Sequence, residues 1–282
     1  RPLPHVARQT IADLRDEKPL RRAIARCDAI VQLAAMSNDP LGELDPTLMR
    51  QVNHGATLRV IALAAGRPLV LYSSASVYGA NDEPCTEDSA VRPLTLYSEL
   101  KLATEHVALE RANALVLRNG TVHGPAPVPR GDLLLNAMAA SAVTSGEIVL
   151  TTEPATRRPV IDVRDLATLT VGLLERRVAG LYNVAAANIS VGEAARLVAR
   201  MSGAGVVERY DRADPRNYAM DVSKLMRLVG AWWRPRSLEA SITDLVADYR
   251  DIGLTASEVA TRRYHRVGQF LSRAPVDEAA AQ

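Results

Sequence analysis

The sequence predicts an α/β fold built on a parallel β-sheet, and two observations support this prediction. Short apolar runs, typical of buried strands, lie at residues 29–33, 69–72 and 114–117. Longer segments with helical periodicity follow the first two runs, at 46–66 and 95–112. Strands that alternate with helices of this length favour parallel pairing, because each helix carries the chain back to the same end of the sheet.

The second half of the chain predicts a smaller α/β lobe. Prolines at positions 125, 127 and 129 mark a stiff connection, after which the pattern changes. Helical patterns then lie near 131–143, 165–177, 191–202 and 237–250, and short extended segments lie near 147–151, 181–185 and 206–210. We therefore expect one domain over residues 1–125 and a second over residues 126–282, with some crossing of the chain between them.

The composition allows a large core and argues against two classes of partner. Of the 282 residues, 48% are hydrophobic, and the formal net charge is only +2. So small a charge gives no reason to expect binding to nucleic acid or to a membrane surface. The two cysteines, Cys27 and Cys85, show neither metal-ligand spacing nor a disulfide framework, so no metal site is predicted. No apolar run approaches the length of a transmembrane helix, and we expect a cytoplasmic protein.

Small or polar residues follow each of the three apolar runs. They are Ala34 and Ala35 after the first run, Ser73 and Ser74 after the second, and residues 118–121 after the third. In an open parallel sheet, ligands bind beyond the carboxyl ends of the strands. These positions therefore predict a ligand crevice at one edge of the sheet.

Tyr97 and Lys101 stand four residues apart in a helical segment, so they share one face of the helix. A free tyrosine titrates near pH ~10, and a nearby ammonium lowers the pKa of the phenol. Such a phenol can take a proton from an alcohol near neutral pH, while Ser74, at a strand end, could hold the same hydroxyl. This is the chemistry of hydride transfer to a nicotinamide. The alternative is a solvated helix pair beside a plain polar turn.

Eight segments, taken together, carry a resemblance to a known family. They are DLRD (13–16), LAAMS (33–37), VNHGAT (52–57), SSASVYG (73–79), YSELK (97–101), LRNGTVHGP (117–125), RPVIDVRD (158–165) and PRNYAMDVSK (215–224). In this order and spacing they resemble the extended short-chain dehydrogenase/reductases, in particular the NAD-dependent epimerase/dehydratase family acting on nucleotide sugars. The resemblance runs from about Ile11 to about Tyr249, and it implies a Rossmann-like sheet with a smaller C-terminal lobe that binds substrate.

The resemblance also implies roles for individual residues. Tyr97 matches the catalytic base, Lys101 the lysine that holds the nicotinamide ribose, and Ser74 the residue that positions the sugar hydroxyl. The residues implied to bind the cofactor, NAD or NADP, are Asp13, Leu14, Leu33, Ala34, Ala35, Asn53, Ser73, Tyr97 and Lys101. The residues implied to bind the nucleotide-sugar substrate are Ser76, Thr121, Arg158 and Arg216.

One part of the family pattern has no match. The family begins with a strand, a Gly-x-x-Gly-x-x-Gly turn and a helix, whose N-terminus faces the pyrophosphate. Only about ten residues precede Ile11, where roughly forty to fifty are expected for this first βαβ unit. We therefore expect the chain, which begins at Arg1, to be a fragment, and the alternative is a shortened relative that has lost the cofactor.

The residues after Ser74 bear on the reaction. In the family's 4,6-dehydratases an Asp-Glu pair follows the catalytic residue, whereas this chain has Ala75 and Ser76, which cannot act as strong acids. This favours an epimerase, with a ketoreductase also compatible, over a dehydratase or decarboxylase. The other hypotheses are a cofactor-free relative with non-redox chemistry, such as a cyclase or lyase, and a non-catalytic partner subunit.

Three further expectations follow from the resemblance or the local sequence. Asp162 stands where the family usually carries a histidine, which changes the local network. His123, just before Pro125, is expected to lie in a loop rather than to act as a catalyst. The helices at 46–66 and 95–112 are expected to pair with those of a second copy, giving a homodimer.

Overall fold

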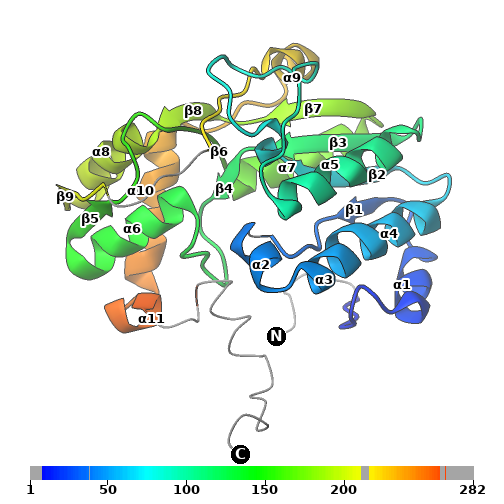
Figure 1. Cartoon of the computed structure of the whole chain (residues 1–282), viewed down its shortest axis with the longest axis horizontal. Helices are drawn as coiled ribbons and strands as arrows, with labels where there is room; N and C mark the ends of the chain where they lie inside the picture. Colours follow the sequence, from blue (N-terminus) through cyan, green and yellow to red (C-terminus); the bar gives the residue numbers. More distant parts are fainter. Residues whose placement is uncertain (1–7, 38, 211–215, 261–263, 265–282) are drawn as a thin grey trace, which may run out of the picture. The chain divides into compact units, whose positions relative to one another are not determined.

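The computed structural model describes residues 8–37, 39–210, 216–260 and 264, which divide into two compact units (Figure 1). The first unit takes its residues from the ranges 1–77, 93–118 and 170–182. The second takes them from 78–92, 119–169 and 183–282. The chain thus passes between the two units more than once. A domain boundary near residue 125, with cofactor binding before it and substrate binding after it, stays a prediction.

A four-stranded sheet forms the centre of the first unit, with the order β1-β2-β3-β7 (Figure 1). Its strands are β1 (Ile30–Gln32), β2 (Leu69–Ser74), β3 (Ala114–Asn119) and β7 (Gly180–Val184). β1 and β2 run parallel, with Ile30 opposite Leu69. Every residue of β3 is buried, as expected for a strand covered on both faces. The predicted α/β fold with a parallel sheet is confirmed.

Helices of the first unit precede and follow these strands. They are α1 (Glu17–Ile24), α2 (Asp39–Leu44), α3 (Pro46–Met49), η1 (Arg50–Ala56), α4 (Thr57–Ala64) and α5 (Leu96–Leu109). The helix predicted over 46–66 is confirmed, but its middle, η1, is a π-helical turn, a feature that hydrophobic periodicity does not reveal. A short 3₁₀ turn, η2 (Ala75–Tyr78), follows β2 directly.

Apolar side chains of α1, α4, α5 and the strands build the core of the first unit. Its members include Ile24, Ile30, Val60, Ile61, Leu69, Leu71, Ala108 and Val116. Among the described strands β1 lies at the edge of the sheet, and its Val31 is 39% exposed.

The second unit holds two small sheets. One has the order β4-β6-β8, from strands β4 (Thr121–His123), β6 (Arg157–Asp162) and β8 (Ala187–Ser190). β4 runs parallel to β6, and β8 antiparallel to it. The other sheet pairs β5 (Glu147–Leu150) with β9 (Gly205–Glu208) in parallel.

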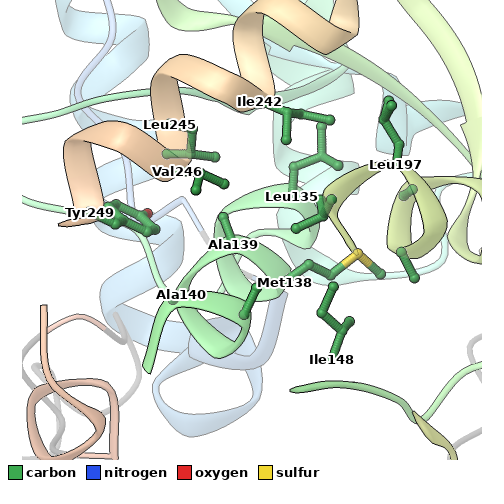
Figure 2. Close-up of a cluster of buried hydrophobic side chains, with 14 of the residues drawn as sticks. Leu135, Met138, Ala139, Ala140, Ile148, Leu197, Ile242, Leu245, Val246 and Tyr249 are labelled. Carbon is green, nitrogen blue, oxygen red and sulfur yellow. The ribbon is translucent and has the colours of Figure 1, made fainter. Parts of the chain in front are cut away.

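Helices α6, α8 and α10 enclose the main core of the second unit. Its helices are α6 (Leu134–Ser145), α7 (Val163–Glu175, shared with the first unit), α8 (Val191–Ser202), α9 (Ser223–Val229), α10 (Leu238–Asp251) and α11 (Ala256–Ala260). Figure 2 shows Leu245 and Val246 of α10 above Ala139 of α6, with Leu197 of α8 beside Leu135. The helix predicted over 191–202 is confirmed, and α8 has the same bounds.

The expectation that His123 lies in a loop is wrong, because His123 is the last residue of β4 and is only 2% exposed. β4 is three residues long and pairs with β6, in which Asp162 lies opposite His123. A strand this short carries no periodicity of its own, so only its distant partner defines it.

None of the helices in the described ranges is long and apolar enough to cross a lipid bilayer.

Helix α5 begins at a capping box, which gives a first prediction. Thr95 Oγ1 accepts from the Ser98 N–H at 3.2 Å and donates to Asp39 Oδ1 at 2.6 Å. Thr95→Ala removes both bonds, so we expect the free energy of unfolding in urea to fall by about 1–2 kcal/mol. Thr95→Ser keeps the hydroxyl and should stay within about 0.5 kcal/mol of the wild type. Equal stabilities of the alanine and serine variants would contradict this account.

Candidate functional site

The carboxyl end of β2 turns directly into η2 and places two serine hydroxyls together. Ser74 Oγ accepts one hydrogen bond from the Ser76 N–H at 3.2 Å and another from Ser76 Oγ at 2.8 Å. Because Ser74 acts as the acceptor in both, its own hydroxyl hydrogen remains available to a ligand. Ser76, predicted to bind substrate, is buried and holds Ser74 in place.

Helix α5 places Tyr97 and Lys101 on one face, as predicted. Lys101 Nζ lies 5.7 Å from the centroid of the Tyr97 ring and donates to the Tyr72 carbonyl at 2.7 Å. Burial lowers the pKa of Lys101 to about 8, and the negative charge of Glu105 partly offsets that effect. The structure therefore brings the tyrosine and the lysine together, and their catalytic roles stay predictions.

A third residue of this helix face, Glu105, was missed by the sequence analysis. Its carboxylate is fully buried and accepts hydrogen bonds from Ser73 Oγ and from Arg118. Arg118 donates through Nε and through Nη2, the latter at 2.8 Å. Two signals could have revealed the pair. Glu105 continues the spacing of four set by Tyr97 and Lys101, and Arg118 ends an apolar run that is too buried for an unpaired charge.

Asn53 clamps the segment that follows β1. Its Oδ1 accepts from the Met36 N–H at 2.8 Å, and its Nδ2 donates to the Met36 carbonyl at 3.0 Å. Asn53 is buried in η1, while Leu33 and Ala34 beyond the strand end are exposed. The amide thus fixes a loop whose backbone and small side chains remain open to a ligand.

Asp13 was predicted to bind the cofactor, and the structure pairs it with Arg15. Its Oδ1 accepts from Arg15 Nε at 3.0 Å, and its Oδ2 accepts from Nη2 at 2.7 Å. Hydrogen bonds from Arg15 lower the pKa of Asp13 to about 2. Leu14 between them packs against the core of the first unit. Contact of Asp13 with a cofactor stays a prediction.

Three of the residues predicted to bind substrate lie in the second unit. Thr121 opens β4, and Arg158 on β6 lies beside the Arg216 segment. Arg158 is only 7% exposed, and its Nη1 donates to the carbonyls of Arg157, at 2.8 Å, and Arg216. Its guanidinium also stacks over Tyr218 at 5.5 Å from the ring centroid. The structure joins the two arginine segments, and their binding of a nucleotide-sugar substrate stays a prediction.

A buried polar chain joins β4, β6 and α10 in the second unit. Ser241 donates to Asp162 Oδ2, and His123 Nε2 lies 2.9 Å from the Ser241 hydroxyl oxygen. Because the serine proton is used on the carboxylate, the histidine carries its hydrogen on Nε2 and donates it. Burial lowers the pKa of His123 to about 4, so the ring is neutral at pH 7.

Arg164 completes this chain on the solvent side. It donates to Asp162 through Nε at 3.0 Å and Nη2 at 2.7 Å. Burial alone would raise the pKa of Asp162, but the hydrogen bonds from Arg164 and Ser241 outweigh it and lower the pKa to about 2. Asp162 is therefore a carboxylate at every physiological pH.

The sequence profile of the NAD dependent epimerase/dehydratase family matches residues 3–185, which is more than half of the chain. This chain belongs to the NAD dependent epimerase/dehydratase family.

Solved structures of similar fold include nucleotide-sugar enzymes. RMD from Pseudomonas aeruginosa, complexed with NADPH, has a TM-score of 0.76 and 22% identity, covering 89% of this chain and 90% of that one. UDP-glucose 4-epimerase from Thermotoga maritima, solved with UDP-glucose, has a TM-score of 0.76 and 21% identity over 86% and 84%. The UDP-glucose 4-epimerase from Thermus thermophilus, a complex with NAD, has a TM-score of 0.73 and 24% identity over 85% and 83%.

Asp162 stands where the resemblance led us to expect a histidine, and the structure links it through the Ser241 hydroxyl to His123 of β4.

The burial of His123 predicts a pH dependence of stability. Its pKa is lowered from 6.5 to about 4 on folding. The unfolding free energy is therefore unaffected by this group above pH 6.5, and it decreases as the pH falls from 6.5 toward 4, because the unfolded chain then binds a proton that the folded chain does not. We expect roughly 2 kcal/mol less unfolding free energy at pH 5 than at pH 7 from this group. The Asp162 contribution is lost only at lower pH, between 3.8 and about 2.

Urea denaturation at pH 7 and pH 5 checks this prediction. His123→Gln keeps a donor for Ser241 but cannot titrate, so the difference between the two pH values should shrink by roughly 2 kcal/mol. His106→Gln, at an exposed position of α5, is the matched control and should leave the difference unchanged. Identical pH dependence in the wild type and His123→Gln would rule out the account.

Proposed function

We propose that the chain is a nicotinamide-dependent enzyme that epimerises a nucleotide-activated sugar, with Ser74, Tyr97 and Lys101 as its catalytic residues. The carrying observation is the buried Lys101 ammonium, anchored on the Tyr72 carbonyl at 2.7 Å and held 5.7 Å from the Tyr97 ring centroid. A positive charge beside a phenol favours its ionised form, which can accept a proton from a sugar hydroxyl. Family membership and the fold shared with nucleotide-sugar enzymes support the same assignment.

The residues of the first unit fit a dinucleotide. An ammonium has three N–H donors, and Lys101 directs one at the Tyr72 carbonyl, which leaves donors for ribose hydroxyls. The open backbone of residues 33–35, held from behind by Asn53, would lie along the cofactor, with Asp13, Leu14 and Ser73 as further contacts. NAD and NADP both remain candidates, and when bound either one supplies a nicotinamide that accepts and returns a hydride.

Ser74, Tyr97 and Lys101 have separate roles at the sugar. Ser74, whose oxygen is held by two donors from Ser76, directs its own hydrogen to the hydroxyl oxygen that is to lose its proton. Tyr97 takes that proton, and Lys101 stabilises the phenolate that precedes the transfer. The same groups return the proton when the hydride is restored to the sugar.

Substrate selection is proposed for the second unit. Thr121, Arg158 and Arg216 would address the nucleotide sugar, with the arginines directed at its diphosphate, because guanidinium groups match phosphate oxygens. Pairing of the helices at 46–66 and 95–112 into a homodimer stays a prediction.

Removal of the Tyr97 hydroxyl tests the proposed base. We expect Tyr97→Phe to lower kcat by about 10²–10⁴-fold, the usual contribution of acid–base catalysis, with dinucleotide affinity within about threefold of wild type. Calorimetric titration with NAD and NADP and mass spectrometry of ligand released on denaturation establish the cofactor. Tyr210→Phe, at a 53% exposed tyrosine, is the control and should keep full turnover. Full turnover of Tyr97→Phe would remove Tyr97 from the mechanism.

Solvent isotope incorporation distinguishes epimerisation from the related reactions. Ala75 and Ser76 supply no acid for the elimination of water, so we expect turnover in D₂O to give an epimer without carbon-bound deuterium. We also expect no net change in nicotinamide absorbance, because the hydride that leaves the sugar returns to it. Stoichiometric consumption of reduced cofactor would indicate a reductase, and deuterium on carbon would indicate a dehydratase; either outcome overturns the epimerase assignment.

A further inference from the structure

A fully buried ion pair lies directly behind the proposed catalytic residues. The Glu105 carboxylate has no exposure to solvent, and the Arg118 side chain is 5% exposed. Desolvating two charges is costly, and apolar replacements of such pairs are often equally stable or more stable. The stability of the first unit alone therefore gives no reason for an ion pair at this place.

The contacts of the pair lead to the site. Three consecutive residues at the end of β2 contact helix α5 or carry a group proposed to contact the ligand. The Tyr72 carbonyl accepts from Lys101, Ser73 Oγ donates to Glu105, and Ser74 carries the hydroxyl proposed for the substrate. Lys101 and Glu105 are one helical turn apart, so two contacts in successive turns fix this strand end to α5. Arg118, from the neighbouring strand β3, holds Glu105 on its other side.

We propose that the Glu105–Arg118 pair is a positioning device for the proposed reaction, in which Glu105 places a negative charge one helical turn from Lys101 and, through Ser73, keeps the end of β2 in register with α5. The catalytic part of this inference rests on the proposed function. The electrostatic part concerns only the first unit and can be measured without substrate or cofactor.

Among charged groups, Glu105 has the direct influence on Lys101. The elements with most contacts to α5 are β2, α2, η1 and α4, and their charged or titratable side chains include Asp39, Glu43, Arg50, His54, Arg59 and Tyr72. Strand β3 adds Arg118, which contacts Glu105. Of the described residues, Glu105 is the one whose charge raises the pKa of Lys101, against the lowering by burial. Arg118 lies beyond the carboxylate and orients it.

The chain is well suited to a direct measurement, because lysine occurs at only three positions, 18, 101 and 224. Two-dimensional NMR of ¹³Cε-labelled lysine therefore gives three resonances, and a pH titration reports Lys101 by itself. The wild-type value should be about 8. Lys18 and Lys224 are internal references for changes elsewhere in the chain.

The deciding variant is the double substitution Glu105→Gln with Arg118→Met. It removes both charges of the pair together, so that neither partner is left as an unpaired ion, and it keeps an acceptor for Ser73. We expect a folded protein in which the pKa of Lys101 is lower by roughly half a unit or more, because the negative charge near it is gone. The alkaline limb of the kcat/KM profile should move to lower pH by the same amount, and kcat at pH 7.5 should fall on the order of tenfold or more. Arg118→Lys, which keeps the charge, should retain the wild-type Lys101 titration.

Three outcomes decide the proposal. A folded double variant with the wild-type Lys101 titration and turnover would show a merely structural pair and overturn it. If the double variant does not fold, Ser73→Ala keeps both charges and removes the contact between the strand end and Glu105. Calorimetric titration of this variant with NAD and NADP shows whether the cofactor contact proposed for Ser73 is lost as well, and the positioning role requires unchanged dinucleotide affinity. Ser73→Ala should lower kcat while Lys101 titrates as in the wild type, and unchanged kcat would then overturn the positioning role. If the wild type turns over no nucleotide sugar, the proposed function fails, whereas the Lys101 shift still tests the electrostatic part.

Discussion

The burial of the Lys101 ammonium is the constraint on which the first unit's site depends. An ammonium taken out of water must be compensated by acceptors and negative charge, or it loses its proton. Here the Tyr72 carbonyl, the Tyr97 ring and the Glu105 carboxylate provide that compensation. These groups belong to β2 and α5. If the helix shifted along the strand, the ammonium would lose these partners while it stayed buried among apolar groups. One cation therefore fixes the register that places Ser74 at the strand end.

The second unit meets the converse problem, a buried carboxylate that must stay ionised. Asp162 is 1% exposed, yet two hydrogen bonds from Arg164 side-chain nitrogens and one from Ser241 keep its pKa low. The Ser241 hydroxyl also accepts a hydrogen bond from the neutral His123 ring, so one hydroxyl links a residue of β4 to a residue of β6. In each unit a buried charge is compensated by residues from two or three elements, and this fixes how those elements pack within that unit.

The sequence predicts those elements whose signal is local and misses those defined by distant partners. The periodicity of 191–202 predicts α8, and the apolar run at 69–72 predicts β2. The short strands β4, β6 and β8 were not predicted, because their hydrogen-bond partners lie tens of residues away. The Tyr97–Lys101 pair follows from helical spacing, whereas the Arg118–Glu105 pair joins α5 to β3 and becomes visible only when the sheet is formed. The resemblance implies substrate binding by Arg158, whereas its burial and its bond to the Arg216 carbonyl become visible only in the folded second unit.

The choice of lysine at position 101 is itself informative. The chain has 34 lysines and arginines, and all but three of them are arginine, yet the buried cation of α5 is a lysine. A guanidinium is planar, needs several acceptors and stays charged at every accessible pH, so it suits Arg118, which donates to both oxygens of Glu105. An ammonium is compact, bonds the single carbonyl that β2 offers with one of its three N–H groups, and has a pKa that burial lowers to about 8 against the opposing effect of one carboxylate. Of the two cations, only the ammonium has a pKa that its surroundings can bring near neutral pH. A proton-transfer site requires a group of this kind, whereas an ion pair that only stabilises the fold does not.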